Sequence, residues 1–212
     1  MGYKWNELQA THTLNSIASR LDLDDELYAL LGMPCYDAQL LEKKNESRRA
    51  EWLAVRLLVK ELFGSECEVA YHPTGRPYLK HGTAHISISH TKGFAAVAYH
   101  HAAPIGMDIE YLSSRVERIA SRFTTQVEAS YIDVHDEDVC QMYHLINWSA
   151  KETLYKLFDS PSMAEFKEVF HIAPYTLGEC GAMDAMVCGA EKSVLAVSYR
   201  TFPEFVCTWA VL

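Results

Sequence analysis

The stretch Pro104-Ile105-Gly106-Met107-Asp108-Ile109-Glu110 is the part of the sequence from which the fold and the chemistry are best read. Alternate residues of a β-strand point to the same face, so Asp108 and Glu110 would lie side by side while Met107 and Ile109 face the other way. Two adjacent carboxylates suit a hard divalent cation such as Mg²⁺. The alternative is an ordinary strand end that carries two solvated acids.

Size and charge limit the classes of protein to consider. The chain has 212 residues, of which 49% are hydrophobic, enough for one large domain or two small ones with a sizeable core. Its formal net charge of −9 argues against general attraction to nucleic acid or to an anionic membrane. A ligand that carries phosphate would therefore need a local cluster of basic side chains.

The sequence shows no apolar run of membrane-spanning length and no signal peptide at its N-terminus. Its six cysteines include no C-x-x-C pair, which argues against a structural zinc site and favours reduced thiols. We therefore expect a cytoplasmic protein.

Hydrophobic periodicity predicts two long helices among short strands. The helices are expected at 42–63 and 140–158, and a shorter one at 115–123. The basic residues in the first long helix are either a solvated charged face or a phosphate contact. Strands are expected at 66–71, 84–90, 94–99, through Asp108, and at 193–200 and 204–212. Residues 1–40 are mixed, with helical spacing from Leu14 to Leu21.

The two long helices repeat a pattern in which Ala follows Trp by two residues and Lys follows it by eight. The matching residues are Trp52, Ala54 and Lys60 in the first and Trp148, Ala150 and Lys156 in the second. This echo predicts an α+β fold of two similar halves, 1–104 and 105–212, each a small antiparallel sheet packed on a long helix. A ligand cleft would then lie between the halves. Chance similarity in composition is the alternative.

The second long helix adds chemistry to the two acids. Glu152 could supply a third metal ligand, and Lys156, four residues later, shares its helix face. A surface salt bridge between the two is the alternative. Acids for a metal, with Lys, Arg and His for phosphate oxygens, fit phosphoryl transfer assisted by Mg²⁺. The sequence has neither a Walker A motif nor G-x-G-x-x-G.

Four motifs in order resemble the 4′-phosphopantetheinyl transferase superfamily. They are Gly75-Arg76-Pro77, Ile88-Ser89-His90, Gly106-Met107-Asp108-Ile109-Glu110, and Trp148-Ser149-Ala150-Lys151-Glu152 followed by Lys156. The length and the two halves resemble the Sfp-type branch, in which a single chain forms a pseudo-dimer. A monomer is therefore expected.

This resemblance implies transfer of the phosphopantetheine arm of coenzyme A to a serine of an apo acyl or peptidyl carrier protein, with release of 3′,5′-ADP. The carrier would serve fatty acid, polyketide or nonribosomal peptide biosynthesis. The implied Mg²⁺ ligands, with Mn²⁺ as a substitute, are Asp108, Glu110 and Glu152. The implied catalytic residues are Asp108, Glu152 (also the candidate general base) and Lys156. The implied coenzyme A contacts are Arg49 (or Arg48), Arg76, Ser89, His90, Asp108, Lys151 and Lys156.

Three alternative functions remain at this point. The same acids could serve an Mg²⁺-dependent pyrophosphatase that acts on coenzyme A or nucleotides, the chain could be a catalytically silent binder of coenzyme A or a carrier, or the motifs could be fortuitous in a structural α+β protein. The segment Thr124-Thr125-Gln126 and the residues after Lys156 depart from the family pattern. We expect a largely apolar carrier-docking surface near the cleft between the halves and the segment 111–135, because an acidic carrier would repel an acidic enzyme.

Overall fold

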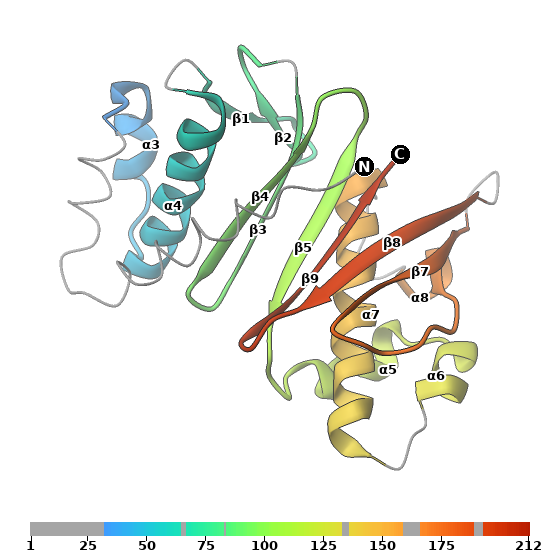
Figure 1. Cartoon of the computed structure of the whole chain (residues 1–212). Helices are drawn as coiled ribbons and strands as arrows, with labels where there is room; N and C mark the ends of the chain where they lie inside the picture. The colour runs from blue at the N-terminus through green and yellow to red at the C-terminus, as the bar shows by residue number, and fades with distance from the viewer. Residues whose placement is uncertain (1–31, 65–66, 83, 133–135, 159–165, 189–192) are drawn as a thin grey trace. The chain divides into compact units, whose positions relative to one another are not determined.

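A computed structural model describes residues 32–64, 67–82, 84–132, 136–158, 166–188 and 193–212 (Figure 1). The chain divides into two compact units, Met1–Ala102 and Ala103–Leu212, which are described separately. The predicted helical spacing from Leu14 to Leu21 lies outside the described residues, as does the turn directly after Phe158.

The first unit combines helices with two β-hairpins. Its elements are η1 (Pro34–Tyr36), α3 (Asp37–Leu41), α4 (Glu46–Phe63), β1 (Val69–Tyr71), β2 (Pro77–Leu79), β3 (His85–Thr91) and β4 (Phe94–His100). β1 pairs with β2 and β3 with β4, both antiparallel. The Asn45 side chain caps α4 by accepting from the Arg48 amide at 3.1 Å, and Gly64, with φ of 84°, ends the helix.

α4 packs its apolar side against β4 and buries one charged residue. Val55, Leu58 and Val59 join the core of the unit with residues of the hairpins. Arg56 is only 2% exposed, its guanidinium lies 4.0 Å from the Trp52 ring centroid, and its Nη2 donates to the Tyr71 hydroxyl at 3.2 Å. Part of the basic helix is therefore neither solvated nor available to a phosphate.

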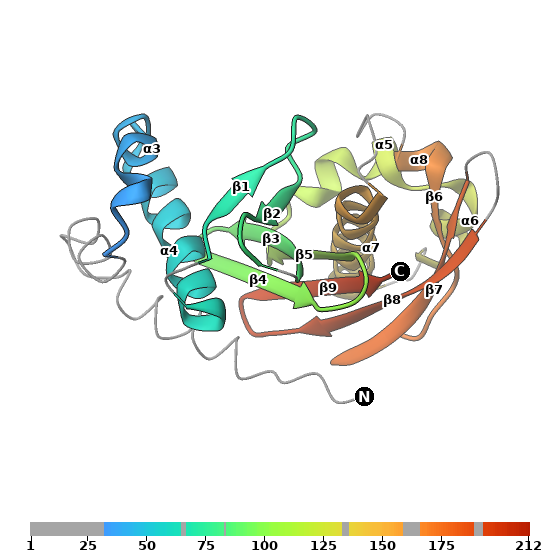
Figure 2. The same ribbon diagram turned by 90° about the horizontal axis from the view of Figure 1, so that it is seen from above.

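The second unit wraps one antiparallel sheet around a long helix. Its helices are η2 (Val116–Ile119), α5 (Ala120–Phe123), α6 (Gln126–Ile132), α7 (Glu137–Phe158) and α8 (Phe166–Val169). Its strands are β5 (Ile105–Tyr111), β6 (Phe170–Ile172), β7 (Cys180–Val187), β8 (Ser193–Thr201) and β9 (Phe205–Val211), in the order β5-β9-β8-β7-β6. Viewed from above, the sheet curls around α7 like a half-barrel (Figure 2).

A glycine sets how closely α7 approaches β5. A Cβ added at Gly106 would run into the Thr153 carbonyl oxygen and come within 2.8 Å of the Leu157 Cβ. No side chain fits between strand and helix at that point. Gly106 therefore lets α7 lie directly on β5, which carries Asp108 two residues later.

Buried hydroxyls fasten the same helix to β9, the neighbour of β5 in the sheet. Thr208 on β9 is opposite Asp108 in the strand register. The Thr208 Oγ1 lies 3.0 Å from Ser149 Oγ and 2.6 Å from Thr153 Oγ1, and Thr153 Oγ1 also donates to the Thr208 carbonyl at 3.1 Å. All three hydroxyl-bearing residues are buried. These bonds fix the rotation of α7 and so the direction of the side chains on its other positions.

The structure confirms the α+β class with antiparallel sheets, the two long helices and the hairpin over residues 85–100. It adds α6 and β7, which were not predicted as elements. Within the described chain, no helix is both long and apolar enough to cross a membrane.

Candidate active site

β5 presents its two acids toward α7. Asp108 is 4% exposed, and its two oxygens accept from different residues of α7: Oδ2 from Ser149 Oγ at 2.9 Å and Oδ1 from Lys156 Nζ at 2.8 Å. Glu110 Oε1 accepts from the Trp148 indole at 2.9 Å. The strand alternation thus puts both carboxylates on one face, against one helix.

One face of α7 provides the remaining groups through residues four apart. Trp148, Glu152 and Lys156 follow each other at this spacing, which keeps them neighbours on a helix surface. Lys156 Nζ also donates to the Met107 carbonyl at 3.2 Å, so the ammonium bridges two adjacent residues of β5. Among the residues that the structure describes, none donates a hydrogen bond to the Glu152 carboxylate.

Burial and mutual repulsion raise the pKa values of Glu110 and Glu152. Burial, followed by the charge of Asp108, raises the pKa of Glu152 to about 7, while Lys156 acts in the opposite direction. Burial and then Asp108 also raise the pKa of Glu110, against the hydrogen bond from Trp148. Lys156, and for Glu110 also Arg115, oppose these shifts only in part, so a further positive charge at the site would relieve the repulsion.

The donor set of this cluster fits a hard divalent cation. Asp108, Glu110 and Glu152 offer only carboxylate oxygens, which Mg²⁺ prefers. Their oxygens lie farther apart than in a closed coordination shell. Within the described chain, the group that brings one ligand atom from each of three residues within 4.8 Å is a different one, Glu117, Cys140 and His144. An ion held by all three acids would therefore need their side chains to move closer together.

Lys151 lies on a different side of α7 and is engaged in the interior. Its ammonium is 0% exposed, donates to Glu128 at 2.9 Å and donates to the Phe123 carbonyl at 2.6 Å. Burial lowers the pKa of Lys151, and the Glu128 carboxylate opposes that shift. Lys151 was predicted to contact the coenzyme, but its ammonium is not exposed.

Glu128 is the buried centre of this second network. Its carboxylate also accepts from the Ile172 amide at 2.8 Å and the Thr125 amide at 2.7 Å, while Thr125 Oγ1 accepts from the Glu128 amide at 3.1 Å. The exchange between Thr125 and Glu128 is a capping box at the start of α6. Sequence reasoning missed it, although the Thr-x-x-Glu spacing is visible.

The other predicted coenzyme contacts lie in the first unit. Arg49 is on α4, Arg76 is in the turn between β1 and β2, and Ser89 and His90 are on β3. Ser89 is buried, whereas the His90 side chain is 56% exposed and its Nδ1 lies 3.4 Å from the Glu51 carboxylate. The structure thus gathers Asp108, Glu110, Glu152 and Lys156 within the second unit.

Two supporting residues were not assigned a role from the sequence. Trp148 and Ser149 belong to the motif that precedes Glu152, and each donates to one of the β5 acids. Position 148 precedes Glu152 by one helical turn, which is the spacing that could have identified it. The contribution of Thr208, more than fifty residues away, has no local signal in the sequence.

Comparison with known proteins adds one result. A family model described as the 4′-phosphopantetheinyl transferase superfamily matches residues 104–189, which include all four clustered residues but none of the predicted contacts in the first unit. No curated protein matches the chain.

Proposed function

We propose that this protein is a 4′-phosphopantetheinyl transferase of the two-half, Sfp-type branch. The observation that carries the proposal is the cluster of Asp108, Glu110 and Glu152 with Lys156, which lies inside the stretch matched by the superfamily model. The proposed reaction moves the phosphopantetheine arm of coenzyme A to a serine hydroxyl of an apo acyl or peptidyl carrier protein.

The reaction breaks the phosphoanhydride bond of the coenzyme A pyrophosphate and forms a phosphoester bond to serine. The serine oxygen bonds to the β-phosphorus of coenzyme A, the bond from that phosphorus to the bridging oxygen breaks, and 3′,5′-ADP leaves. The serine proton must go to a base. Glu152 is our candidate for that base, because its motif resembles that of the superfamily and its carboxylate lies in the cluster with Asp108 and Lys156. No covalent intermediate with the enzyme is required.

Asp108, Glu110 and Glu152 would hold Mg²⁺, or Mn²⁺ in its place, and the ion would supply positive charge to the pyrophosphate oxygens. Lys156 would supply a second positive charge, and its bonds to Asp108 and the Met107 carbonyl preset its position. Ser149 and Trp148 would keep the two β5 acids in place.

The remaining contacts are assigned to the first unit. We place coenzyme A phosphates and adenosine against Arg49, Arg76, Ser89 and His90, by the resemblance of their motifs to the superfamily. Lys151 is left out of this assignment because its ammonium is buried against Glu128. The protein would act as a cytoplasmic monomer in fatty acid, polyketide or nonribosomal peptide biosynthesis.

The test is the intact mass of an apo carrier protein after incubation with this protein, coenzyme A and Mg²⁺. The carrier should gain one phosphopantetheine arm, and Glu152→Gln and Lys156→Met should each slow the gain about 100–1000-fold. Glu137→Gln removes an exposed acid from the same helix and should leave the rate unchanged. If Glu152→Gln transfers as fast as the unaltered protein, Glu152 is not the base.

The pyrophosphatase and the silent binder would each give a different result in this test. An Mg²⁺-dependent pyrophosphatase would break coenzyme A down in the absence of a carrier and leave the carrier mass unchanged. A silent binder would retain coenzyme A and give neither product. The presence of Asp108, Glu110 and Glu152 together with Lys156 favours a working enzyme over a silent binder, since a binder would not need to keep all four.

A further inference from the structure

A second group of metal-ligating side chains lies on α7, outside the proposed active site. Cys140 and His144 are four residues apart and share a face of the helix. Glu117, on η2, reaches the same place: its Oε1 lies 2.8 Å from His144 Nδ1, and Cys140 Sγ lies 3.8 Å from that nitrogen. One atom from each residue falls within 4.8 Å of the others.

We propose that Glu117, Cys140 and His144 form a binding site for a transition-metal ion of the Zn²⁺ class. The ion would take Cys140 Sγ, His144 Nδ1 and Glu117 Oε1, with water in the fourth position. Thiolate, imidazole and carboxylate together suit Zn²⁺ or Co²⁺, whereas Mg²⁺ prefers oxygen ligands alone. The site is thus chemically distinct from the acids at Asp108, Glu110 and Glu152.

The observed separations are close to those of a tetrahedral shell. Zinc bond lengths place sulfur and nitrogen ligands about 3.6 Å apart and nitrogen and oxygen ligands about 3.4 Å apart. The sulfur-to-nitrogen distance of 3.8 Å needs almost no change. The nitrogen-to-oxygen distance of 2.8 Å is that of a hydrogen bond, and the ion would replace its proton and widen it.

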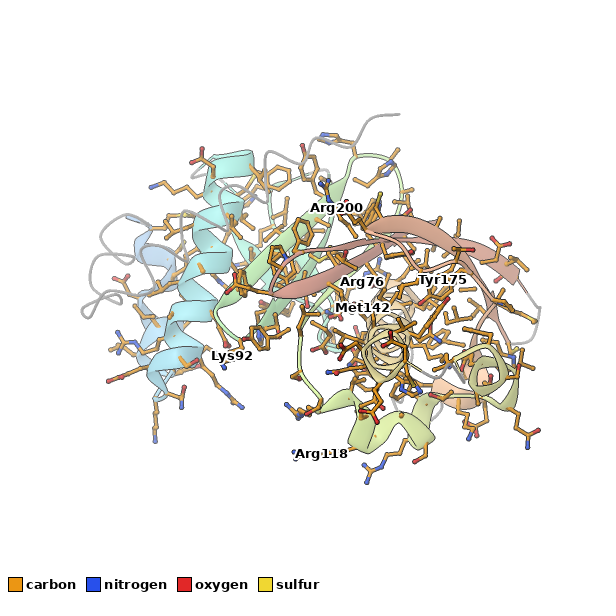
Figure 3. All side chains as sticks on the ribbon, turned by 60° about the horizontal axis from the view of Figure 1, so that its bottom comes forward. Arg76, Lys92, Arg118, Met142, Tyr175 and Arg200 are labelled. Carbon is orange, nitrogen blue, oxygen red and sulfur yellow. The ribbon has the colours of Figure 1, made fainter. Side chains whose placement is uncertain are left out.

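The three side chains are partly open to solvent, so an ion can enter, and the His144 ring is held in place by its neighbour. The Glu117 side chain is 36% exposed and that of His144 13% exposed. Arg118, the next residue of η2, extends into solvent (Figure 3), so this element lies at the surface. The His144 ring packs edge-on to the buried Phe123, with centroids 6.4 Å apart, which limits its rotation.

Binding must release protons. Cys140 must give its thiol proton to solvent to become a ligand, and His144 must carry its proton on Nε2 so that Nδ1 can bind the ion. The ion would also connect η2, which follows β5, to α7 about 12 Å along the helix axis from Glu152. It would stabilise the fold of the second unit without taking part in the transfer reaction.

The test uses the full chain, reduced without thiol reagents and titrated with Co²⁺ alone. We expect a thiolate-to-cobalt charge-transfer absorption that saturates with one equivalent bound at this site, whatever binds at the three acids, and Zn²⁺ to abolish it. Cys140→Ser should abolish the band, and His144→Gln and Glu117→Gln should each weaken Co²⁺ binding at least about 100-fold, since even outer-shell changes cost 10–100-fold.

Cys188 offers a matched control. Its Sγ lies 4.0 Å from His171 Nδ1, a second Cys–His pair with no carboxylate ligand grouped with it in the described chain. Cys188→Ser should leave the cobalt spectrum unchanged. The proposal is overturned if the unaltered protein shows no thiolate band, if the band survives Cys140→Ser, or if Glu117→Gln binds as tightly as the unaltered protein. Each outcome is independent of the transferase proposal, because no activity is measured.

Discussion

At the scale of single residues, Glu152 changes its charge near neutral pH. Its pKa of about 7 lies above the ordinary value of 4.5, so folding favours its protonated form. The stabilisation from that form is complete below about pH 4.5 and is lost as the pH rises through 7. At pH 8 and without a divalent ion, the ionised Glu152 should cost on the order of 2 kcal/mol of unfolding free energy.

Glu152→Gln should remove this cost. In the presence of EDTA, urea unfolding should show the variant to be more stable than the unaltered protein at pH 8, with the advantage shrinking toward pH 5. Glu137→Gln, at an exposed position on the same helix, should show no such trend. An advantage that does not vary with pH would contradict the raised pKa.

The residues of the site were partly predictable. The spacing of Asp108 and Glu110 indicated a shared face, and the four-residue step from Glu152 to Lys156 put those two on one side of a helix. Spacing alone could not show that Lys151, next to Glu152, turns inward to Glu128. That outcome depends on where α6 packs, which is a tertiary feature.

At the scale of elements, the contact between β5 and α7 depends on Gly106. Gly106→Ala would force the strand and helix apart, because the new Cβ meets the Thr153 carbonyl and the Leu157 side chain. We expect a loss of about 2–4 kcal/mol in the free energy of unfolding, measured by urea denaturation.

Gly178 provides the control for this substitution. An added Cβ there would meet nothing closer than the Cys180 carbonyl at 3.6 Å, which is ordinary contact. Gly178→Ala should change stability by less than about 0.5 kcal/mol. Equal effects of the two substitutions would mean that the close approach at Gly106 does not matter.

The second element-scale prediction concerns the Glu128–Lys151 pair, which joins α6 to α7. Lys151→Met leaves the Glu128 carboxylate buried without its cation and should cost about 3–5 kcal/mol. Adding Glu128→Gln removes that orphaned charge, so the double variant should be more stable than Lys151→Met alone. Chemical denaturation of the set measures this coupling.

Lys44→Met, at an exposed position, serves as the control and should be nearly neutral. If the double variant is as unstable as the sum of the two single variants, the two side chains do not interact.

Elements with strong local signals were predicted, and those with weak ones were not. The periodic helices α4 and α7 and the alternating strand β3 are present close to their predicted ranges. α6 was not predicted, although Thr125 and Glu128 form a capping box whose spacing is visible in the sequence. β7 carries Gly181 and two alanines, and such residues give little strand signal.

At the scale of the whole molecule, charge affects how a carrier protein would dock. The chain has a net charge of −9, so an acidic carrier meets long-range repulsion. Val127, on α6, is 64% exposed and lies within the segment 111–135 where we expect an apolar docking surface. Carrier affinity should therefore change by less than about threefold as salt screens the surface charges, and Val127→Asp should weaken it.

The segment 111–135 also carries exposed arginines, which would bind an acidic carrier if docking were electrostatic. Arg115, Arg118 and Arg122 are all exposed on or beside η2 and α5. If carrier affinity falls steeply as salt rises, and Arg118→Ala weakens binding while Val127→Asp does not, docking is electrostatic and the apolar interpretation is wrong.

The two-half organisation remains a prediction at this scale. The repeated Trp, Ala and Lys spacing suggested two similar halves, and the chain does divide into two compact units. Their sheets differ, with two separate hairpins in one unit and five strands in the other. The repeated spacing describes residues along a helix, and it carries no information about how many strands pack on that helix.

The measurement that tests the central claim most directly is a simultaneous count of holo-carrier and 3′,5′-ADP in one reaction containing coenzyme A, apo carrier and Mg²⁺. The proposed transfer predicts one nucleotide released for each arm attached, with both products lost when the carrier serine is replaced by alanine. Nucleotide release that continues without the serine, or without any gain in carrier mass, would contradict the transferase and indicate hydrolysis of coenzyme A.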